Sequence, residues 1–281
     1  MSKVWFITGA GRGMGLEITK TALRKGDCVI ATTRNENRLN LSNEYKERFL
    51  NLQLDVADFT QEQVNGVVEK AIKQFARIDI LVNNAGHGRI TNFEETSEEN
   101  IREIFELNVF GLMRVTRAVL PFMRKQKSGH IFNIASAAGY GAGPVAYHTS
   151  KFAVTGFSTC LAFEVEPFGI KVTNVAPGLF RTSFYNKEAM RTEIDNHIED
   201  YDNFRWQDDF VKNNSNHEQP GDPVKLSELI YEVSHTEKPP LHLPVGKDAV
   251  ETMESLEMKL KEDVDCWRDR ASKTSFAKNE D

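Results

Sequence analysis

The sequence has few cysteines, no long apolar run and no excess of positive charge. Its three cysteines, Cys28, Cys160 and Cys266, are isolated from one another, which argues against a disulfide framework or a zinc site and is typical of a reducing compartment. No apolar run approaches the roughly 20 residues that span a bilayer, and the N-terminus has no pattern of a secretory signal. The net charge of -6 argues against nucleic acid or an anionic membrane as the main partner. We therefore expect a cytoplasmic globular protein without a membrane span or a bound metal.

The first two-thirds of the chain alternates short β-branched runs with helical patterns. Several of these runs are apolar throughout, as is typical of strands that are buried on both faces of a parallel sheet. Two helix starts, Thr60–Gln63 and Thr96–Glu99, have the form of a capping box. The alternation predicts an α/β fold with a doubly wound parallel sheet, the Rossmann fold, in three α/β/α layers. The expected strands are Val4–Thr8, Cys28–Thr33, Leu50–Asp55, Ile78–Asn83, His130–Ala135, Ile170–Ala176 and one within Pro239–Gly246.

The region that begins near Ser183 departs from this alternation. Residues 183–222 mix aromatic with acidic side chains and lack strand character, which predicts an inserted segment that covers the substrate. Ordinary packing against the edge of the sheet explains the same aromatics equally well. The candidate wall residues are Phe184, Tyr185, Met190, Tyr201, Phe204, Trp206 and Phe210. A polar helix is expected from Ala249 to about Asp269, inside a C-terminal region of residues 247–281, and we expect residues 1–281 to form one domain.

A glycine-rich turn, TGAGRGMG (Thr8–Gly15), follows the first expected strand and opens a helix. Glycine permits positive φ and lets the backbone approach a phosphate closely, while the helix N-terminus supplies amide hydrogens and partial positive charge. The spacing is not G-x-G-x-x-G, because the position of the third glycine holds Met14. The strand before the turn and the helix after it favour a dinucleotide site over a merely structural turn. Its candidate contacts are Gly9, Gly11, Arg12, Gly13, Met14 and Gly15.

The end of the second strand indicates which dinucleotide would bind. NAD-binding proteins usually place an acid there to hold the ribose 2′-hydroxyl, whereas this chain has Thr33 followed by Arg34. Arg12 stands in the glycine turn, near where a 2′-phosphate would lie, and a guanidinium binds phosphate through a bidentate fork. Each arginine alone would be an ordinary surface residue. Together, and without the acid, they favour NADP(H), with NAD(H) as the alternative.

Tyr147 and Lys151, in AYHTSKFA, are four residues apart and therefore share one face of a helix. Reduction of a carbonyl with a nicotinamide requires a proton on oxygen besides the hydride on carbon. A lysine one turn from a tyrosine stabilises its phenolate, and Ser136 could donate a hydrogen bond to the same oxygen. Taken singly, each residue has an ordinary alternative, such as a turn cap for Ser136 or solvation for Lys151. In combination they favour general acid–base catalysis.

The chain resembles the short-chain dehydrogenase/reductase family over roughly residues 3–182. The motifs that carry this resemblance are TGAGRGMG, LDV (Leu54–Val56), NNAG (Asn83–Gly86), LNVFG (Leu107–Gly111), Ser136, YHTSK (Tyr147–Lys151) and PGLFRT (Pro177–Thr182), in the order of the family. The resemblance implies that Tyr147 is the catalytic acid/base and that Lys151 lowers its pKa. It implies further that Ser136 orients the substrate carbonyl and that Asn108 completes a proton relay. Implied cofactor contacts, besides the glycine turn and Thr33, Arg34, Tyr147 and Lys151, are Asp55, Val56, Asn83, Ala85, Gly86, Pro177, Gly178 and Thr182.

The resemblance also implies a homodimer or homotetramer, assembled through the helices near Ile101–Arg124 and Tyr147–Glu166. The second helix offers Phe152, Phe157, Leu161 and Val165 for such a contact. One departure from the family concerns the spacing from Ser136 to Tyr147, which is about two residues shorter than usual. Because this loop borders the substrate entrance, we expect the contraction to change the shape of the pocket.

The combined prediction is an NADP(H)-dependent oxidoreductase that interconverts a ketone or aldehyde and an alcohol, with a small hydrophobic compound as substrate. His87 and His148 border the expected site, but no ligand spacing around them indicates a metal. Two alternatives remain open. An epimerase or dehydratase on the same scaffold would turn over without net oxidation of the cofactor, and a non-catalytic NADP-binding regulator would have little need of the serine, tyrosine and lysine.

Overall fold

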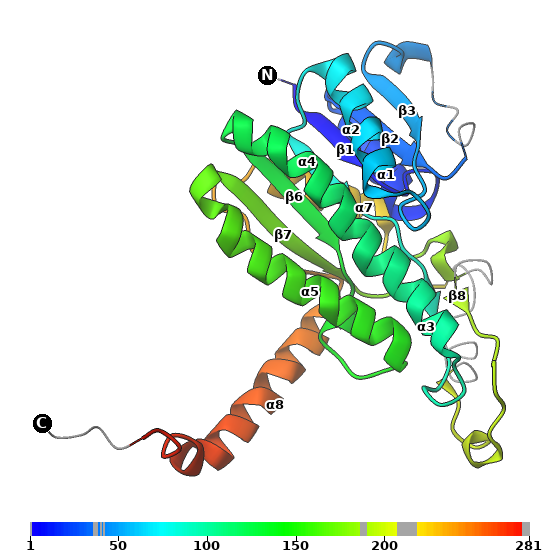
Figure 1. The fold of residues 1–281 in the computed structure, drawn as a ribbon, viewed down its shortest axis with the longest axis vertical. Helices are drawn as coiled ribbons and strands as arrows, with labels where there is room; N and C mark the ends of the chain where they lie inside the picture. Colours follow the sequence, from blue (N-terminus) through cyan, green and yellow to red (C-terminus); the bar gives the residue numbers. More distant parts are fainter. Residues whose placement is uncertain are drawn as a thin grey trace, which may run out of the picture.

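The structure is a computed structural model that describes residues 2–35, 39, 41, 43–185, 190–206 and 218–276. A seven-stranded sheet, all parallel, runs through its centre in the order β3-β2-β1-β4-β6-β7-β9 (Figure 1). This is the predicted Rossmann-type sheet, and each predicted strand is present. The strands are β1 (Val4–Ile7), β2 (Cys28–Thr33), β3 (Phe49–Gln53), β4 (Ile80–Asn83), β6 (Gly129–Ile134), β7 (Ile170–Pro177) and β9 (His242–Val245).

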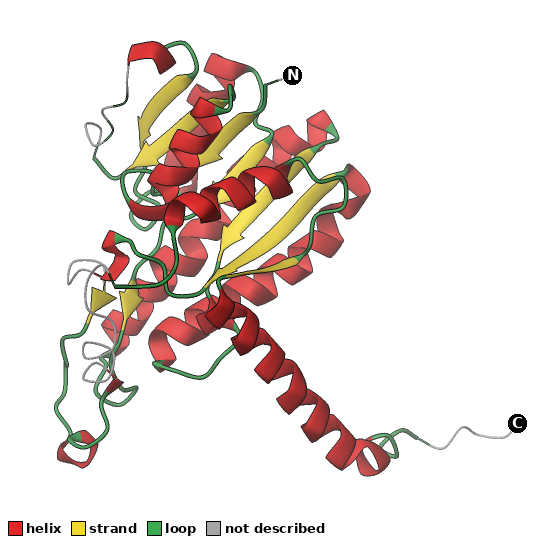
Figure 2. Cartoon of the chain, turned by 180° about the vertical axis from the view of Figure 1, so that it is seen from behind, coloured by secondary structure: helices red, strands yellow, loops and turns green. Residues whose placement is uncertain are grey.

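Helices cover both faces of the sheet and give the predicted three layers (Figures 1 and 2). The core explains why the strands are apolar throughout: in β1, Val4 and Phe6 enter the cluster on one face, and Trp5 and Ile7 enter the cluster on the other. The first cluster includes side chains of α2, α4 and α5, and the second includes side chains of α1 and α7. The helices are α1 (Gly13–Arg24), α2 (Gln61–Phe75), α3 (Glu98–Phe105), α4 (Leu112–Gln126), α5 (Val145–Val165), α7 (Pro223–Ser234) and α8 (Lys247–Ala271).

The two predicted capping boxes have different outcomes. Thr60 caps α2 as expected: its side chain accepts from the backbone N–H of Gln63, and the Gln63 side chain accepts from the backbone N–H of Thr60. The box at Thr96–Glu99 is wrong by one residue, because Ser97 is the cap of α3. The Thr96 hydroxyl instead donates to the carbonyl oxygen of Asn92 at 2.7 Å, so its side chain supports the preceding turn.

Two local features depart from the expectations. Residues 183–222 were expected to lack strands, yet β8 (Met190–Arg191) pairs in parallel with β5 (Gly88–Arg89). The long helix expected near Ile101–Arg124 is α3 and α4 joined by a π-helical turn, η2 (Glu106–Gly111). Such π-turns are frequent at functional sites, and this one contains Asn108.

The helix α5 exposes only part of the face that was predicted to serve assembly. Leu161 and Val165, predicted to serve assembly, are buried in the core beside the sheet. Phe152 is exposed as expected, and Phe163, which was not predicted, is 82% exposed. Apolar residues occur on both faces of α5, so their spacing in the sequence does not show which face packs on the sheet. Within the described ranges, no helix has the length and apolar character needed to traverse a bilayer.

Candidate active site

A cleft of about 310 Å³ opens where the sheet strands end at their carboxyl termini, which is where open α/β sheets bind ligands. Most of the predicted site residues meet there, although they come from segments spread over the chain. Those that line the cleft are Gly9, Gly11, Arg12, Gly13, Met14, Thr33, Arg34, Asp55, Val56, Ala85, Gly86, Ser136, Tyr147, Lys151, Pro177, Gly178 and Thr182.

The glycine turn fits a cofactor phosphate by its backbone. Gly9 has a φ of +64°, and a Cβ at this residue would lie 2.9 Å from the Cα of Ala85, so a side chain is excluded by both conformation and space. Gly15 does not line the cleft, because its role is close packing: a Cβ there would lie 2.6 Å from the carbonyl oxygen of Gly9. The turn leads directly into α1, whose N-terminus faces the cleft and favours an anion.

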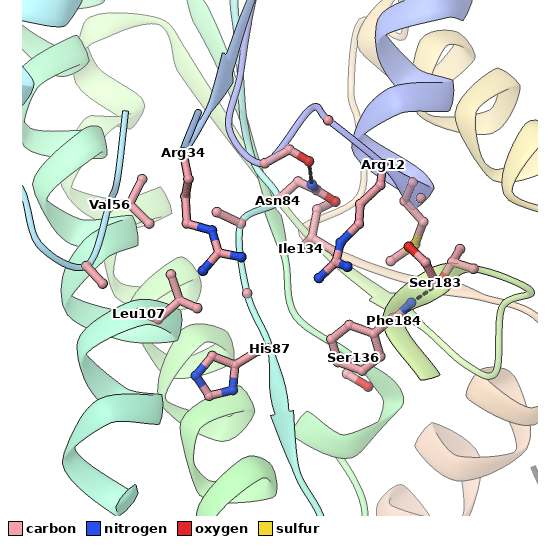
Figure 3. A pocket seen from close by; sticks show the side chains of 18 of the residues that line it. Arg12, Arg34, Val56, Asn84, His87, Leu107, Ile134, Ser136, Ser183 and Phe184 are labelled. Carbon is pink, nitrogen blue, oxygen red and sulfur yellow. Dashed lines mark hydrogen bonds between the residues drawn. The ribbon is translucent and has the colours of Figure 1, made fainter. Parts of the chain in front are cut away.

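Arg12 and Arg34 both extend into the cleft, Arg12 from the glycine turn and Arg34 from the end of β2 (Figure 3). The carbonyl oxygen of Arg34 accepts a hydrogen bond from the side chain of Gln53 at 2.9 Å, which ties the end of β2 to β3. Two guanidiniums in one cleft provide a donor set that suits a phosphate monoester.

The cleft is also lined by Ser136, Tyr147 and Lys151. The Ser136 hydroxyl follows β6 and accepts a hydrogen bond from the backbone N–H of Ala138 at 3.1 Å, so it caps a turn as well as lining the cleft. Tyr147 and Lys151 lie one turn apart on α5, with the lysine Nζ 5.7 Å from the centre of the tyrosine ring. Nζ also donates to the carbonyl oxygen of Ile134 at 3.0 Å, which fixes the ammonium at the end of β6.

Burial controls the acidity of Tyr147 and Lys151. It raises the pKa of Tyr147 to about 12, while the neighbouring Ser136 hydroxyl acts in the opposite direction by hydrogen bonding. Burial also lowers the pKa of Lys151 to about 8. The structure therefore differs from the expectation that Lys151 brings the pKa of Tyr147 below that of a free phenol. The desolvation of both groups is the reason, because it penalises each charged form.

Asn108 and Asn83 are buried next to the cleft and do not line it. The Asn108 side chain clamps the backbone of His87: its Nδ2 donates to the His87 carbonyl at 3.0 Å, and its Oδ1 accepts from the His87 N–H at 3.1 Å. A Cβ on Gly86 would lie 3.0 Å from that Oδ1 and 3.7 Å from the Nζ of Lys151, so Asn108 and Lys151 meet across this glycine. Asn83 lies within the sheet, where its Nδ2 donates to Thr116.

The expected aromatic wall is only partly present. Phe184 and Tyr185 line the cleft, but the side chain of Met190 packs against Gly88 instead. Phe204 and Trp206 contact each other edge to face and, like Tyr201, do not line the cleft, while Phe210 lies outside the described residues.

Charged residues also line the cleft. The guanidinium of Arg191, on β8, forms an ion pair with the carboxylate of Glu103, on α3, and both side chains line the cleft with His87. Burial lowers the pKa of His87, so its ring is neutral near pH 7. The wall is therefore mixed in character, not purely apolar.

The contracted loop between Ser136 and Tyr147 keeps both residues in the cleft. His148 holds this loop, because its Nδ1 lies 2.7 Å from the carbonyl oxygen of Gly141. Its ring also fills the space beside Gly143, where a Cβ would come within 2.1 Å of Nε2. The contraction thus changes the loop without separating the serine from the tyrosine.

Two supporting residues escaped the sequence analysis. Asn84 lines the cleft, and its Nδ2 donates to the carbonyl oxygens of Thr8 and Gly9 at 3.0 and 3.1 Å, which ties β4 to the glycine turn (Figure 3). The position of Asn84 directly after a buried strand was the sequence signal that could have identified it. Asp248, in the first turn of α8, accepts from the backbone N–H of Leu179 at 2.7 Å and so holds the segment after Pro177. No local pattern connects residues that are 69 positions apart.

Comparisons with known proteins agree with this arrangement. The sequence profile described as short chain dehydrogenase matches residues 3–193. The oxidoreductase BOA17 of Botryotinia fuckeliana is 38% identical over 273 residues, which cover 96% of this chain and 98% of that protein. The crystal structure of a short-chain dehydrogenase from Streptomyces avermitilis has a TM-score of 0.87 at 37% identity and covers 98% of this chain and 99% of its own. The structure of ElxO with NADP bound has a TM-score of 0.67 at 27% identity and covers 86% and 96%.

Proposed function

The chain is an oxidoreductase of the short-chain dehydrogenase/reductase family, and from this membership we propose that it interconverts a ketone or aldehyde and an alcohol with NADP(H). The observation that carries the proposal is the cleft itself, which Arg12 and Arg34 line together with the half-buried Ser136 and the buried Tyr147 and Lys151. The glycine turn, which also lines the cleft, suits the phosphates of a dinucleotide. The NADP bound to ElxO supports a nicotinamide cofactor here.

In the proposed reaction the nicotinamide, when bound, supplies or accepts the hydride. Tyr147 gives its phenolic proton to the carbonyl oxygen during reduction and takes it back during oxidation. The raised pKa of Tyr147 keeps that proton on the phenol at neutral pH, and the hydroxyl of Ser136 donates to the same substrate oxygen as negative charge develops there.

Lys151 and Asn108 serve the proton transfer indirectly. The Lys151 ammonium, 5.7 Å from the centre of the Tyr147 ring, favours the phenolate that forms when the proton leaves. Asn108 and the Ile134 carbonyl hold the surroundings of that ammonium in place. We propose that the carbonyl compound lies against Phe184, in the part of the cleft that Glu103 and Arg191 also line.

A panel of ketones and aldehydes tests the proposed reaction. We expect the purified protein to oxidise NADPH with at least one member, with one alcohol formed for each NADPH consumed, as followed by absorbance and product analysis. Turnover without net oxidation of NADPH would favour an epimerase or dehydratase. Binding of NADPH without any turnover across the panel would favour the regulator.

Arg34→Asp tests how the cofactor is chosen. Loss of a charge-assisted hydrogen bond of about 1.5–3 kcal/mol should reduce kcat/KM for NADPH roughly 10- to 150-fold. The introduced carboxylate should accept a hydrogen bond from an unphosphorylated ribose and favour NADH. The measurement is the ratio of kcat/KM for the two cofactors with the best substrate of the panel.

The exposed Arg117 on α4 provides the matched control for this charge reversal. Arg117→Asp makes the same change in net charge away from the cleft and should leave the cofactor ratio unchanged. If Arg34→Asp and Arg117→Asp gave the same ratio as the unmodified protein, Arg34 would have no part in recognising the 2′-phosphate.

A further inference from the structure

The outer half of α8, residues 257–271, extends away from the body of the molecule in both views (Figures 1 and 2). At its start the helix packs on β9 and on the short turn η3 (Ala137–Gly139), and Ala249 is buried there. From residue 257 onward every side chain of the helix is exposed. The outer half therefore has no packing partner within the described part of this chain.

An apolar stripe runs the length of this helix. Met253 and Leu256 are partly buried where α8 leaves the body. The same helical face continues with Leu260, Val264 and Trp267, which are 55%, 54% and 57% exposed. Steps of three and four residues keep them on one side of a helix. We call these three residues the outer stripe. Single exposed apolar residues are ordinary, whereas three that continue a packed stripe mark a contact surface.

The helix has only modest support of its own along this half. The ion pairs Lys259–Asp263 and Lys261–Asp265, each four residues apart, join exposed side chains and therefore stabilise the helix only weakly. Isolated helices of about 15 residues are marginal in water, and most helices in proteins depend on packing of an apolar face. A projecting helix with an apolar face is therefore the form expected of an element that packs on another molecule.

We propose that the outer stripe packs against a second copy of this chain. A second copy would bring an apolar surface of the required kind, because η2, α5 and the turn η4 (Glu166–Phe168) expose large side chains. These are Phe110, Phe152, Phe163 and Phe168, which are 48%, 44%, 82% and 42% exposed. The outer half of α8 is about 22 Å long, which is too little surface alone for a stable interface of roughly 1,200–2,000 Å². The stripe and the phenylalanine surface together favour a self-contact that uses both.

Charge argues against a membrane as the occupant. Residues 257–271 contain five acidic and four basic side chains, so the flanks of the stripe carry no net positive charge that would attract anionic lipid. The mixture of signs suits contact with another protein surface that also carries both signs, as this chain does with 35 basic and 41 acidic residues.

The test compares two double variants that add the same charge to the same helix. Leu260→Glu/Val264→Glu disrupts the outer stripe, whereas Met258→Glu/Cys266→Glu changes two exposed residues on other faces of α8. We expect the stripe variant to raise the dissociation constant of self-association at least about thirtyfold, since two buried apolar contacts become charges. The control variant should keep the value of the unmodified protein. Light scattering of the full chain over a range of concentrations measures this constant.

Trp267 provides a second readout that is specific to α8. Its emission, obtained as the difference from a Trp267→Phe variant, should be protected from iodide in the assembled protein and in the control variant. It should become accessible in the stripe variant, even if the phenylalanine surface alone maintains some association. A monomeric unmodified protein would overturn the proposal, as would equal quenching in both double variants. Protection of Trp267 only after addition of vesicles or another protein would overturn it too.

Discussion

Replacing Tyr147 with phenylalanine is expected to lower kcat for carbonyl reduction by about 10²–10⁴-fold, the usual contribution of a positioned general acid. This corresponds to about 3–5.5 kcal/mol of activation free energy. The ring itself should stay in place, because it packs with Ile104 and Ala146 and lies 6.0 Å, centre to centre, from the ring of Phe184. Only the hydroxyl that delivers the proton is lost.

The binding measurement separates this effect from damage to the site. We expect the dissociation constant for NADPH, measured by fluorescence titration, to change little in Tyr147→Phe, since cofactor binding rests largely on the glycine turn and the arginines. Loss of one buried hydroxyl should also change the free energy of unfolding by no more than about 1–2 kcal/mol. A loss of turnover with retained binding and stability is the signature of a missing proton donor.

Tyr185 is the matched control, because it is a second tyrosine that lines the same cleft and whose pKa is also raised by burial. Tyr185→Phe removes the same atom from the same cleft, but from the short 3₁₀ turn η5 (Ser183–Tyr185) and not from the helix α5 that carries Lys151. Its kcat should remain close to that of the unmodified protein. If Tyr147→Phe retained turnover, or if Tyr185→Phe lost as much, the proposed assignment of the proton donor would fail.

The parts of this cleft that the sequence predicted are those fixed by local rules. An apolar strand followed by a glycine turn and a helix specifies its own conformation, so Gly9 and Gly13 could be placed before the structure was known. Tyr147 and Lys151 are likewise set by helix geometry, which brings residues four apart onto one face. The parallel sheet then brings these local pieces together, because the carboxyl ends of its strands lie at one edge.

The parts that escaped prediction depend on contacts between distant segments. Arg191 reaches Glu103 across 88 positions, and the pairing of β8 with β5 places that arginine beside His87. A two-residue strand has too short a pattern to be recognised by alternation. Leu161 and Val165 were assigned to the wrong contact for a similar reason. Their spacing shows that they share one face of a helix, but it does not show whether the sheet or a second subunit covers that face.

The pKa of Tyr147 also could not be predicted from the sequence. The four-residue spacing predicts that Lys151 assists ionisation of Tyr147, but the size of the opposing desolvation depends on how deeply both groups are buried. In the folded chain that burial raises the pKa of Tyr147 to about 12. The same competition between charge and burial acts at a histidine far from the cleft, with a larger consequence for stability.

His130, the second residue of β6, is 3% exposed, and its ring lies tilted against that of Phe132 with centres 4.0 Å apart. Its Nε2 lies 2.9 Å from the hydroxyl oxygen of Thr173, and that hydroxyl donates to the carbonyl oxygen of Pro240. Nε2 must therefore carry the proton, which leaves the lone pair on Nδ1 without a hydrogen-bond partner among the described residues. Protonation of Nδ1 would place a charge in apolar surroundings. Burial, reinforced by the positive charges of Lys171 and Lys3, lowers the pKa of His130 to about 3.

This shift predicts a steep loss of stability in acid. An unfolded histidine takes up a proton below about pH 6.5, whereas His130 in the folded chain stays neutral down to about pH 3. Between these values the unfolded state binds more protons, so the free energy of unfolding falls as pH falls, by up to about 1.4 kcal/mol per pH unit from this group. The full loss approaches about 5 kcal/mol at pH 3. Denaturant unfolding at intervals between pH 7 and pH 4 measures the slope.

His130→Gln isolates that contribution from the carboxylates that also titrate in acid. The glutamine amide is neutral at every pH and keeps an N–H that can donate to Thr173, so the variant should be less stable than the unmodified protein at pH 7 and should lose less stability toward pH 4. The difference between the two proteins should therefore shrink with acidification and then reverse in sign. His197→Gln removes a histidine whose side chain is 60% exposed, and its curve should follow that of the unmodified protein. Parallel curves for His130→Gln and the unmodified protein would mean that the buried ring does not govern acid stability.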